Sequence, residues 1–154
     1  MSNYLEGKAV LKVTEGLRVD RAAAAVPLGG ATGNLFRIVG GRVIVKQIIG
    51  LVTVELGAGA NLSSLNYNPD DGAADDLSDT VDLAAAAAGT VIVPTGDPTD
   101  NLEISVNVIN EQAVGFVMKP GVITLTCAAG PADGRVSWSV LYVPIDDGAY
   151  VEVA

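Results

Sequence analysis

The stretch Leu35–Leu56, LFRIVGGRVIVKQIIGLVTVEL, is the longest part of the chain with strand-forming composition and almost no strand-breaking residues. Glycines at positions 40 and 41 supply the positive φ that a two-residue hairpin turn requires, so the stretch is predicted to fold back there. The hairpin would pair Val39 with Arg42, Arg37 with Ile44, and Leu35 with Lys46. Since successive residues of a strand point to opposite faces, the other face would carry Phe36, Ile38, Val43 and Val45, which are all apolar. We therefore expect a β-sheet with one buried face.

The same stretch changes its alternation near Gly50. Beyond this glycine the apolar residues are Val52, Val54 and Leu56, and they alternate with Thr53 and Glu55. A slip of one residue exchanges the two faces of a strand, so the pattern predicts a bulge or bend near Gly50.

The rest of the chain reads as short apolar or alternating segments separated by turn residues. The strands are expected around residues 62–67, 80–83, 90–94, 102–108, 114–118, 122–127, 135–143 and 149–153. Residues 84–88 are predicted to form one or two helical turns that end at Gly89. This pattern predicts an all-β protein with little helix, a single-domain β-sandwich, and the long loops favour a jelly-roll-like layout.

The predicted domain organisation has two parts. Residues 1–33 are expected to form an extended N-terminal arm and a flexible loop, and residues 34–154 the sandwich. The core is expected to contain the inward residues of the strands, namely Phe36, Ile38, Val43, Val45, Leu102, Ile104, Val106, Ile123, Leu125, Trp138 and Val140.

Composition limits the possible functions. The chain has 154 residues, 49% hydrophobic and 18% charged, which suits one folded domain. It has no uninterrupted apolar run long enough for a membrane span, and charges occupy the first sixteen residues where a signal peptide needs an apolar stretch. We expect neither a membrane partner nor export by that route.

The sequence offers little for catalysis. There is no histidine, which removes the usual general base and the commonest metal ligand, and the single cysteine, Cys127, lies in an apolar run typical of a core position. The acidic segment Asn68–Asp79 could hold calcium, but its spacing misses the EF-hand pattern, and a solvated loop is the preferred interpretation. We expect no enzyme activity, no cofactor and no metal.

Charge is distributed unevenly along the chain. The net charge is -9, which argues against a nucleic-acid partner. Residues 1–46 nevertheless hold seven cations and three acids, net +4, whereas the remainder holds two cations and fifteen acids, net -13. This asymmetry suggests a docking half and a solvated acidic half, although a chance spread over a soluble surface would look the same.

The interface candidates lie in the cationic half. The outward face of the predicted hairpin alternates cations with apolar residues and carries no acid, which is typical of an interface; long stems covering an ordinary sheet face are the alternative. With four cations of the arm, the candidates are Lys8, Lys12, Arg18, Arg21, Leu35, Arg37, Val39, Arg42, Ile44 and Lys46.

Two patterns resemble a known family. One is LFRIVGGRV at residues 35–43 followed by IGLVT at 49–53; the other comprises PGVI at 120–123, LTCAA at 125–129 and VSWSVLYVP at 136–144, with DGA at 147–149. Over residues 34–153 the chain is similar to head decoration, or cement, proteins of tailed bacteriophages.

The resemblance implies a structural protein of the virion that decorates and stabilises the outer surface of the capsid. It would be made in the cytoplasm of the bacterial host. Its partners would be the major capsid protein and itself, as a homo-oligomer with a trimer favoured. The alternative is a carbohydrate-binding or adhesin-like β-sandwich, which would need either a calcium site or exposed aromatic residues, with Trp138 and Tyr142 as the candidates to stack on a sugar.

Overall fold

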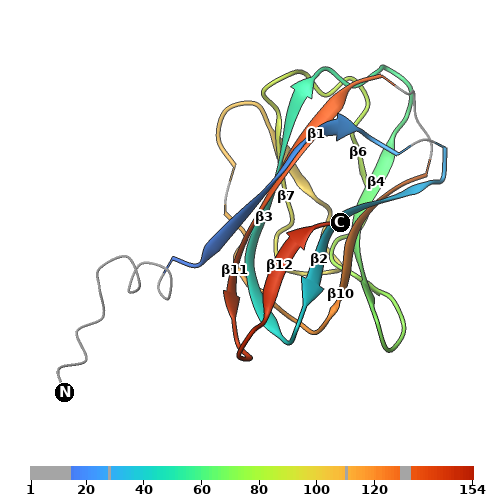
Figure 1. The fold of residues 1–154 in the computed structure, drawn as a ribbon. Coiled ribbons are helices and arrows are strands. Elements are labelled where there is room, and N and C mark those ends of the chain that lie inside the picture. Colours follow the sequence, from blue (N-terminus) through green and yellow to red (C-terminus); the bar gives the residue numbers. More distant parts are fainter. Residues whose placement is uncertain (1–14, 28, 110, 129–132) are drawn as a thin grey trace.

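The computed structural model describes residues 15–27, 29–109, 111–128 and 133–154, and these residues form two antiparallel β-sheets packed face to face (Figure 1). Sheet A has the order β1-β11-β3-β7-β8, with β9 also paired to β3, and sheet B has the order β12-β2-β10-β4-β5, with β6 also paired to β4. The predicted all-β sandwich is confirmed, and the jelly-roll layout stays a prediction.

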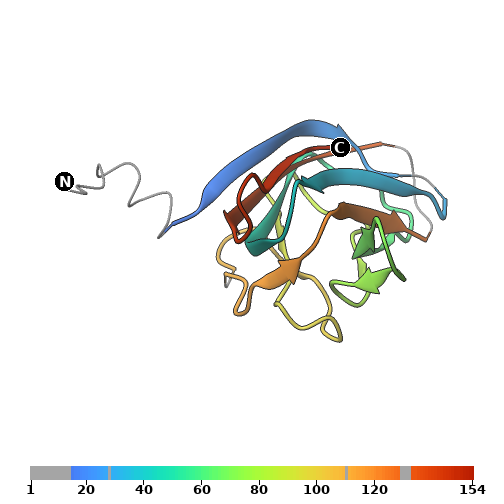
Figure 2. The ribbon, with the colours of Figure 1, turned by 60° about the horizontal axis from the view of Figure 1, so that its bottom comes forward.

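Most of the long strands alternate between the two sheets along the chain. Sheet A contains β1 (Leu17–Ala25), β3 (Val43–Val54), β7 (Val91–Val93), β8 (Glu103–Ser105), β9 (Phe116–Met118) and β11 (Arg135–Pro144). Sheet B contains β2 (Thr32–Val39), β4 (Leu62–Pro69), β5 (Asp75–Asp76), β6 (Val81–Asp82), β10 (Gly121–Cys127) and β12 (Tyr150–Val153). In Figure 2 the blue β1 and the orange β9 lie on opposite sides of the molecule. Within sheet A, β1 pairs with β11, β11 pairs with β3, and β9 pairs with the other edge of β3.

The predicted hairpin at Gly40 and Gly41 is wrong. β2 and β3 belong to different sheets, so the two glycines form a corner between sheets rather than a hairpin turn. Gly40 has a φ of 79°, and a Cβ atom there would lie 2.5 Å from the carbonyl oxygen of Gly148. The glycines are needed because the β11–β12 loop packs directly against this corner.

The buried face expected for the opening stretch is nevertheless correct. Phe36, Ile38, Val43 and Val45 are fully buried, because both sheets direct their apolar residues into the same core. A bulge in β2 and another in β3 interrupt the alternation near these four residues. Leu35 is an additional residue between Phe36, opposite Ile123, and Asn34, opposite Thr124; Leu35 is therefore buried as well.

The change of alternation in β3 arises at Lys46, not at Gly50. Val45 lies opposite Tyr142 and Gln47 opposite Leu141, so Lys46 is the additional residue. Gly50 has a different role, because a Cβ atom there would lie 2.8 Å from the ring of Trp138. A second register shift, at Thr53, explains why Val54 is exposed while Val52 and Leu56 are buried.

The core contains most of the predicted residues. Leu102, Ile123, Leu125, Trp138 and Val140 are buried, as are Cys127 and Tyr142. The Cys127 thiol shares a hydrogen bond with the Ser63 hydroxyl, and burial raises the pKa of this thiol. Residues of both sheets therefore form the core, and the indole of Trp138 lies among them.

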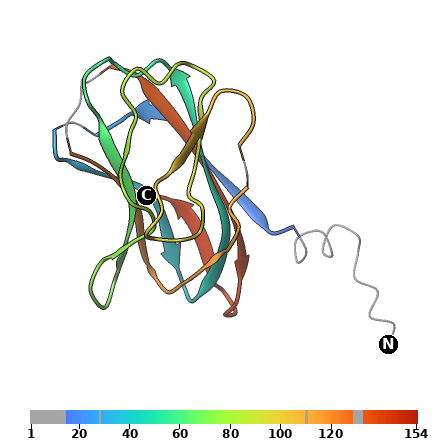
Figure 3. The ribbon, with the colours of Figure 1, turned by 180° about the vertical axis from the view of Figure 1, so that it is seen from behind.

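Ile104 and Val106 were wrongly expected in the core. Their exposed fractions are 40% and 59%, because β8 is a three-residue edge strand with little beside it to cover them. Figure 3 shows this region from behind, with the yellow and gold segment that carries β7 and β8 lying beside β3.

Two local predictions also fail. Residues 84–88 form no helix; the Ala85 backbone N–H donates to the carbonyl of Gly57, and Ala85 has a φ of 53°. The expected boundary at residue 33 falls inside β2, and β1 is a full strand of sheet A beside β11. An arm separate from the sandwich therefore does not describe residues 17–25.

Candidate functional site

The outer face of sheet A is apolar at its centre. Val143, Ile44 and Val117 lie side by side on β11, β3 and β9, and Val117 is 68% exposed. With the other outward apolar residues of these strands and of β7, they form what we call the apolar face: Ile44, Ile49, Leu51, Val91, Val117, Leu141 and Val143. Polar residues such as Ser137, Ser139 and Gln47 lie between them.

A hollow opens beside this face. It has a volume of about 580 Å³ and lies between Ile44 and Leu141 on the sheet and residues 111–115, which precede β9. Gln112 is only 7% exposed; its side-chain nitrogen donates to the carbonyl of Val114. Within the described part of the chain its side-chain oxygen Oε1 is buried without a hydrogen-bond partner.

The outer face of sheet B has the opposite character. Its strands present polar side chains that bond to each other across the sheet, including Thr32 to Thr126 at 3.1 Å and Asn68 to Thr124 at 3.3 Å. Asn66 donates to the Asp76 carboxylate at 2.6 Å. The two outer faces therefore differ: sheet A is apolar at its centre, whereas sheet B is mainly polar and internally hydrogen-bonded, with Leu62 and Tyr150 as its exposed hydrophobic residues.

The structure does not bring the interface candidates onto one face. Arg37 and Val39 lie on β2 in sheet B, whereas Arg18, Ile44 and Lys46 lie on the outer side of sheet A. Leu35 is buried in the core at 2% exposed, so it cannot contribute to an interface in the folded protein.

The remaining candidates in the predicted arm are Arg21, Lys8 and Lys12. Arg21 is half-buried opposite Trp138, at the edge strand β1. Lys8 and Lys12 lie outside the described residues.

Three of the candidate cations already have carboxylate partners within the chain. Arg18 pairs with Asp20 at 2.7 Å, Arg37 with Asp70 at 2.9 Å and Arg42 with Asp146 at 2.8 Å. The Ser139 hydroxyl and Arg18 hold the pKa of Asp20 below its usual range. These ion pairs reduce the positive charge that the sequence predicted for a docking surface. The apolar face of sheet A is therefore the clearest candidate for such a surface.

The Arg42–Asp146 pair fixes the corner between β2 and β3. The Asp146 carboxylate accepts hydrogen bonds from the Arg42 backbone N–H at 2.7 Å and from two guanidinium nitrogens at 2.8 and 2.9 Å. The Ile145 backbone N–H in turn donates to the Arg42 carbonyl. The Arg42 side chain and backbone lower the pKa of Asp146 to about 2.

We expect Asp146→Asn to lower the melting temperature at neutral pH, with a loss that disappears in acid. The folded pKa of about 2 lies below the value of about 3.9 for an unfolded aspartate, so the ionised carboxylate stabilises the fold above pH 4. This stabilisation is lost as the pH falls through 2. Thermal melts of both proteins between pH 7 and pH 2 would measure it, with the adjacent exposed Asp147→Asn as control. An offset that stays constant down to pH 2 would contradict the assignment.

The acidic loop has its own ion pairs. Asp70 pairs with Arg37, and Asp71 pairs with Lys119 at 2.8 Å. Across residues 15–154, apart from the undescribed positions, no cluster of three or more acidic, cysteine or histidine side chains could hold a metal ion. The loop is thus part of the surface ion-pair network.

Trp138 is 2% exposed and Tyr142 is 4% exposed, so neither side chain can stack on a sugar. Sequence reasoning missed Val117 as a surface residue, although Leu141 and Val143 interrupt the polar side of their strand and point to a covered outer face.

Comparison of the chain with protein-family models, with curated proteins and with solved structures found no match. In the described residues, no helix is long and apolar enough to cross a membrane.

Proposed function

We propose that this protein is a decoration protein of a tailed-bacteriophage head, which binds the outer surface of the major capsid protein and stabilises the shell. The observation that carries the proposal is the difference between the two outer faces. An attachment protein needs one face that is favourable to desolvate and another that remains in water, and the sandwich has both.

The apolar face supplies the surface to desolvate. Burying apolar area contributes roughly 25 cal/mol for each Å² removed from water, so a few outward valine, leucine and isoleucine side chains supply useful binding energy. The polar face of sheet B gives no comparable gain, because its side chains already bond to each other.

Attachment to a symmetric shell repeats the same contact many times on one particle. A homo-oligomer, with a trimer favoured, would engage several shell sites at once and gain avidity from them. The proposal therefore includes self-association as well as attachment, on the outer surface of the virion.

Purified heads of the parent phage test the proposal. Mass spectrometry should find this chain at a fixed copy number relative to the major capsid protein, and mild protease treatment of intact heads should cleave it before the shell. Heads made without it should bind the purified protein saturably in a sedimentation assay. Absence from purified heads, together with no binding to them, would contradict the proposal.

A further inference from the structure

A second pocket lies between an edge of sheet A and an edge of sheet B. It has a volume of about 670 Å³ and is lined by β9 of sheet A, β5 of sheet B and the loop at residues 98–99. Its floor is apolar, because Leu77 and Met118 are buried and Phe116 is half-buried. Pockets of this size with an apolar lining and a few polar groups are typical of binding sites.

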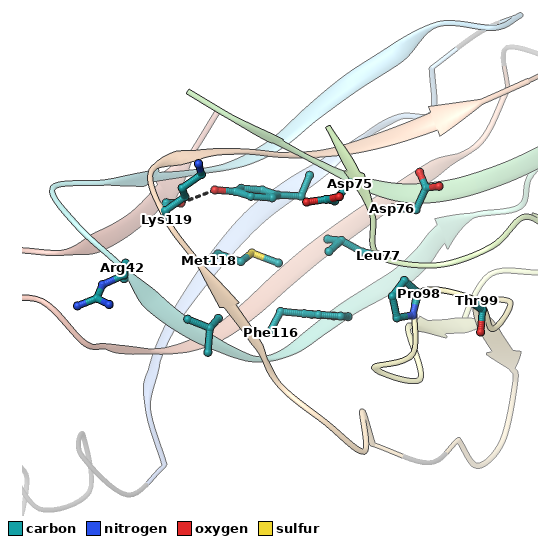
Figure 4. A pocket seen from close by; sticks show the side chains of 11 residues that line it. Arg42, Asp75, Asp76, Leu77, Pro98, Thr99, Phe116, Met118 and Lys119 are labelled. Atoms are coloured by element: carbon teal, nitrogen blue, oxygen red, sulfur yellow. Dashed lines mark hydrogen bonds between the residues drawn. The ribbon is translucent and has the colours of Figure 1, made fainter. Parts of the chain in front are cut away.

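Charged side chains flank the apolar floor. Figure 4 shows Arg42 and Lys119 on one side of it and Asp75 and Asp76 on the other. Arg42 and Lys119 each form an ion pair of 2.8 Å with a carboxylate that does not line the pocket. Both cations are therefore already neutralised, and the carboxylate side decides which charge the pocket favours.

Asp75 is the carboxylate that shares a face with the pocket. It lies opposite Tyr67 in the pairing of β5 with β4, so both side chains point to the same side of the sheet, and Tyr67 is buried and lines the pocket. Asp76 lies opposite Asn66 and accepts its amide on the outer face of sheet B at 2.6 Å. Among the described residues Asp75 has no ion-pair partner, so one negative charge at the pocket is unpaired.

The pKa of Tyr67 reflects the negative charge around this pocket. Burial of the side chain is the main reason that this pKa is raised to about 12, and the carboxylates of Asp70, Asp71 and Asp75 raise it further. A cation is therefore favoured beside Asp75, and an anion is disfavoured. A wholly apolar occupant would remove water from the Asp75 carboxylate and give it no partner. These conditions favour an occupant that has an apolar stem and a cationic end.

We propose that this pocket binds an arginine side chain of the major capsid protein, with the aliphatic stem on the apolar floor and the guanidinium at Asp75; this inference rests on the proposed function. Arginine covers apolar surface with its stem while its charged end stays at a polar rim. Arginine suits the site better than lysine, because a guanidinium binds a carboxylate through two N–H groups and stacks on an aromatic ring such as that of Phe116.

The position of the pocket identifies the partner. Val117 lines the pocket and also belongs to the apolar face, so the two surfaces are continuous. A protein that docks on the apolar face therefore extends a side chain into the pocket from the same contact surface. Side chains that fill such pockets beside an apolar contact often contribute most of the binding energy, and arginine is common among them.

Titration of the purified full-length protein with n-butylguanidinium, which reproduces the arginine side chain, tests the pocket alone. Methyl NMR should show saturable shifts of Met118 and Leu77, with a dissociation constant on the order of millimolar. n-Butylurea has the same shape without the charge, so it should bind roughly tenfold more weakly or not at all. Asp75→Asn should weaken n-butylguanidinium binding to a similar degree. Asp147→Asn removes an exposed charge outside the pocket and should have no effect.

Absence of these shifts in the wild type would overturn the proposal. Equal binding of n-butylguanidinium and n-butylurea, or of n-butylguanidinium to the wild type and Asp75→Asn, would do the same. Equal melting temperatures of the variants would show that the fold is intact.

Sedimentation with phage heads made without this protein tests the partner. Asp75→Lys should weaken attachment roughly tenfold or more, whereas Asp147→Lys should attach like the wild type. Unchanged attachment of Asp75→Lys would overturn the assignment to the capsid protein. If Asp75→Lys instead dissociates an oligomer in sedimentation velocity and still attaches, the arginine comes from a second copy and the assignment is wrong. A wild type that binds no heads would contradict the proposed function, while the NMR titration still decides whether the pocket binds a guanidinium.

Discussion

Replacing Trp138 with alanine is expected to lower the free energy of unfolding by roughly 3–5 kcal/mol, the usual loss for a buried aromatic residue. Trp138 is 2% exposed and is the largest of the fully buried side chains. It lies on β11 opposite Gly50 of β3, and its ring occupies the space where a Cβ of residue 50 would be. Removing the ring leaves a cavity in the core beside sheet A. The neighbouring strands are held in the sheet and cannot move far enough to fill it.

Urea unfolding would measure the loss, and Gly50→Ala supplies a second test at the same contact. Gly50→Ala alone should destabilise the fold, because its Cβ would lie within 3 Å of two ring carbons. In the Trp138→Ala background this cost should largely disappear, since the space is then empty. Ser137→Ala, on the outward side of the same strand, is the control. A Trp138→Ala loss below about 1 kcal/mol, or strictly additive effects, would show that the indole does not fill this space.

The second large effect concerns attachment. We expect Ile44→Asp combined with Val117→Asp to weaken binding to phage heads by roughly a hundredfold or more, about 2.8 kcal/mol at 1.4 kcal/mol for each factor of ten. The two side chains are cross-strand neighbours on the apolar face. Carboxylates at these positions would lose water on docking without gaining a partner. The fold should persist, because both residues point away from the core.

A matched variant on the other sheet controls for added charge. Leu62 and Tyr150 are outward hydrophobic residues of sheet B, exposed by 45% and 44%. Leu62→Asp/Tyr150→Asp should bind heads like the wild type in the same sedimentation assay. Equal losses in the two double variants, or no loss in either, would remove the apolar face from the attachment site.

The sequence was sufficient to predict which residues of the opening stretch are buried, but not which strands they pair with. Alternation in a strand is local, and it correctly indicates that Phe36, Ile38, Val43 and Val45 point inward. Pairing depends on distant segments: β2 pairs with β10 and β12, and Gly40 and Gly41 suit a corner between sheets as well as a hairpin turn.

Bulges and strand edges account for most of the other errors. Leu35 is buried because a bulge turns two consecutive residues inward, and nothing in its local sequence reveals the shifted register. Ile104 and Val106 have perfect alternation, yet they lie at the end of a short edge strand where no neighbour covers them. Alternation predicts which residues share a face, and only the neighbouring elements decide whether that face is covered.

The candidate docking surface was only partly visible in the sequence. Ile44 was identified there, and Leu141 and Val143 interrupted an otherwise polar side of their strand. The contact of Ile44 with Val117 and Val143 required the register of three strands that are distant in sequence. The cations identified with Ile44 proved to be divided between two sheets, and three of them are paired with carboxylates.

Cryo-electron microscopy of the parent phage head would test most directly whether sheet A is the attachment face. The proposed function predicts density for this sandwich on the outer shell, with Ile44, Val117 and Leu141 against the major capsid protein and the polar outer face of sheet B toward solvent. Density in which sheet B contacts the shell and the apolar face of sheet A is open to water would contradict it, as would heads without this density.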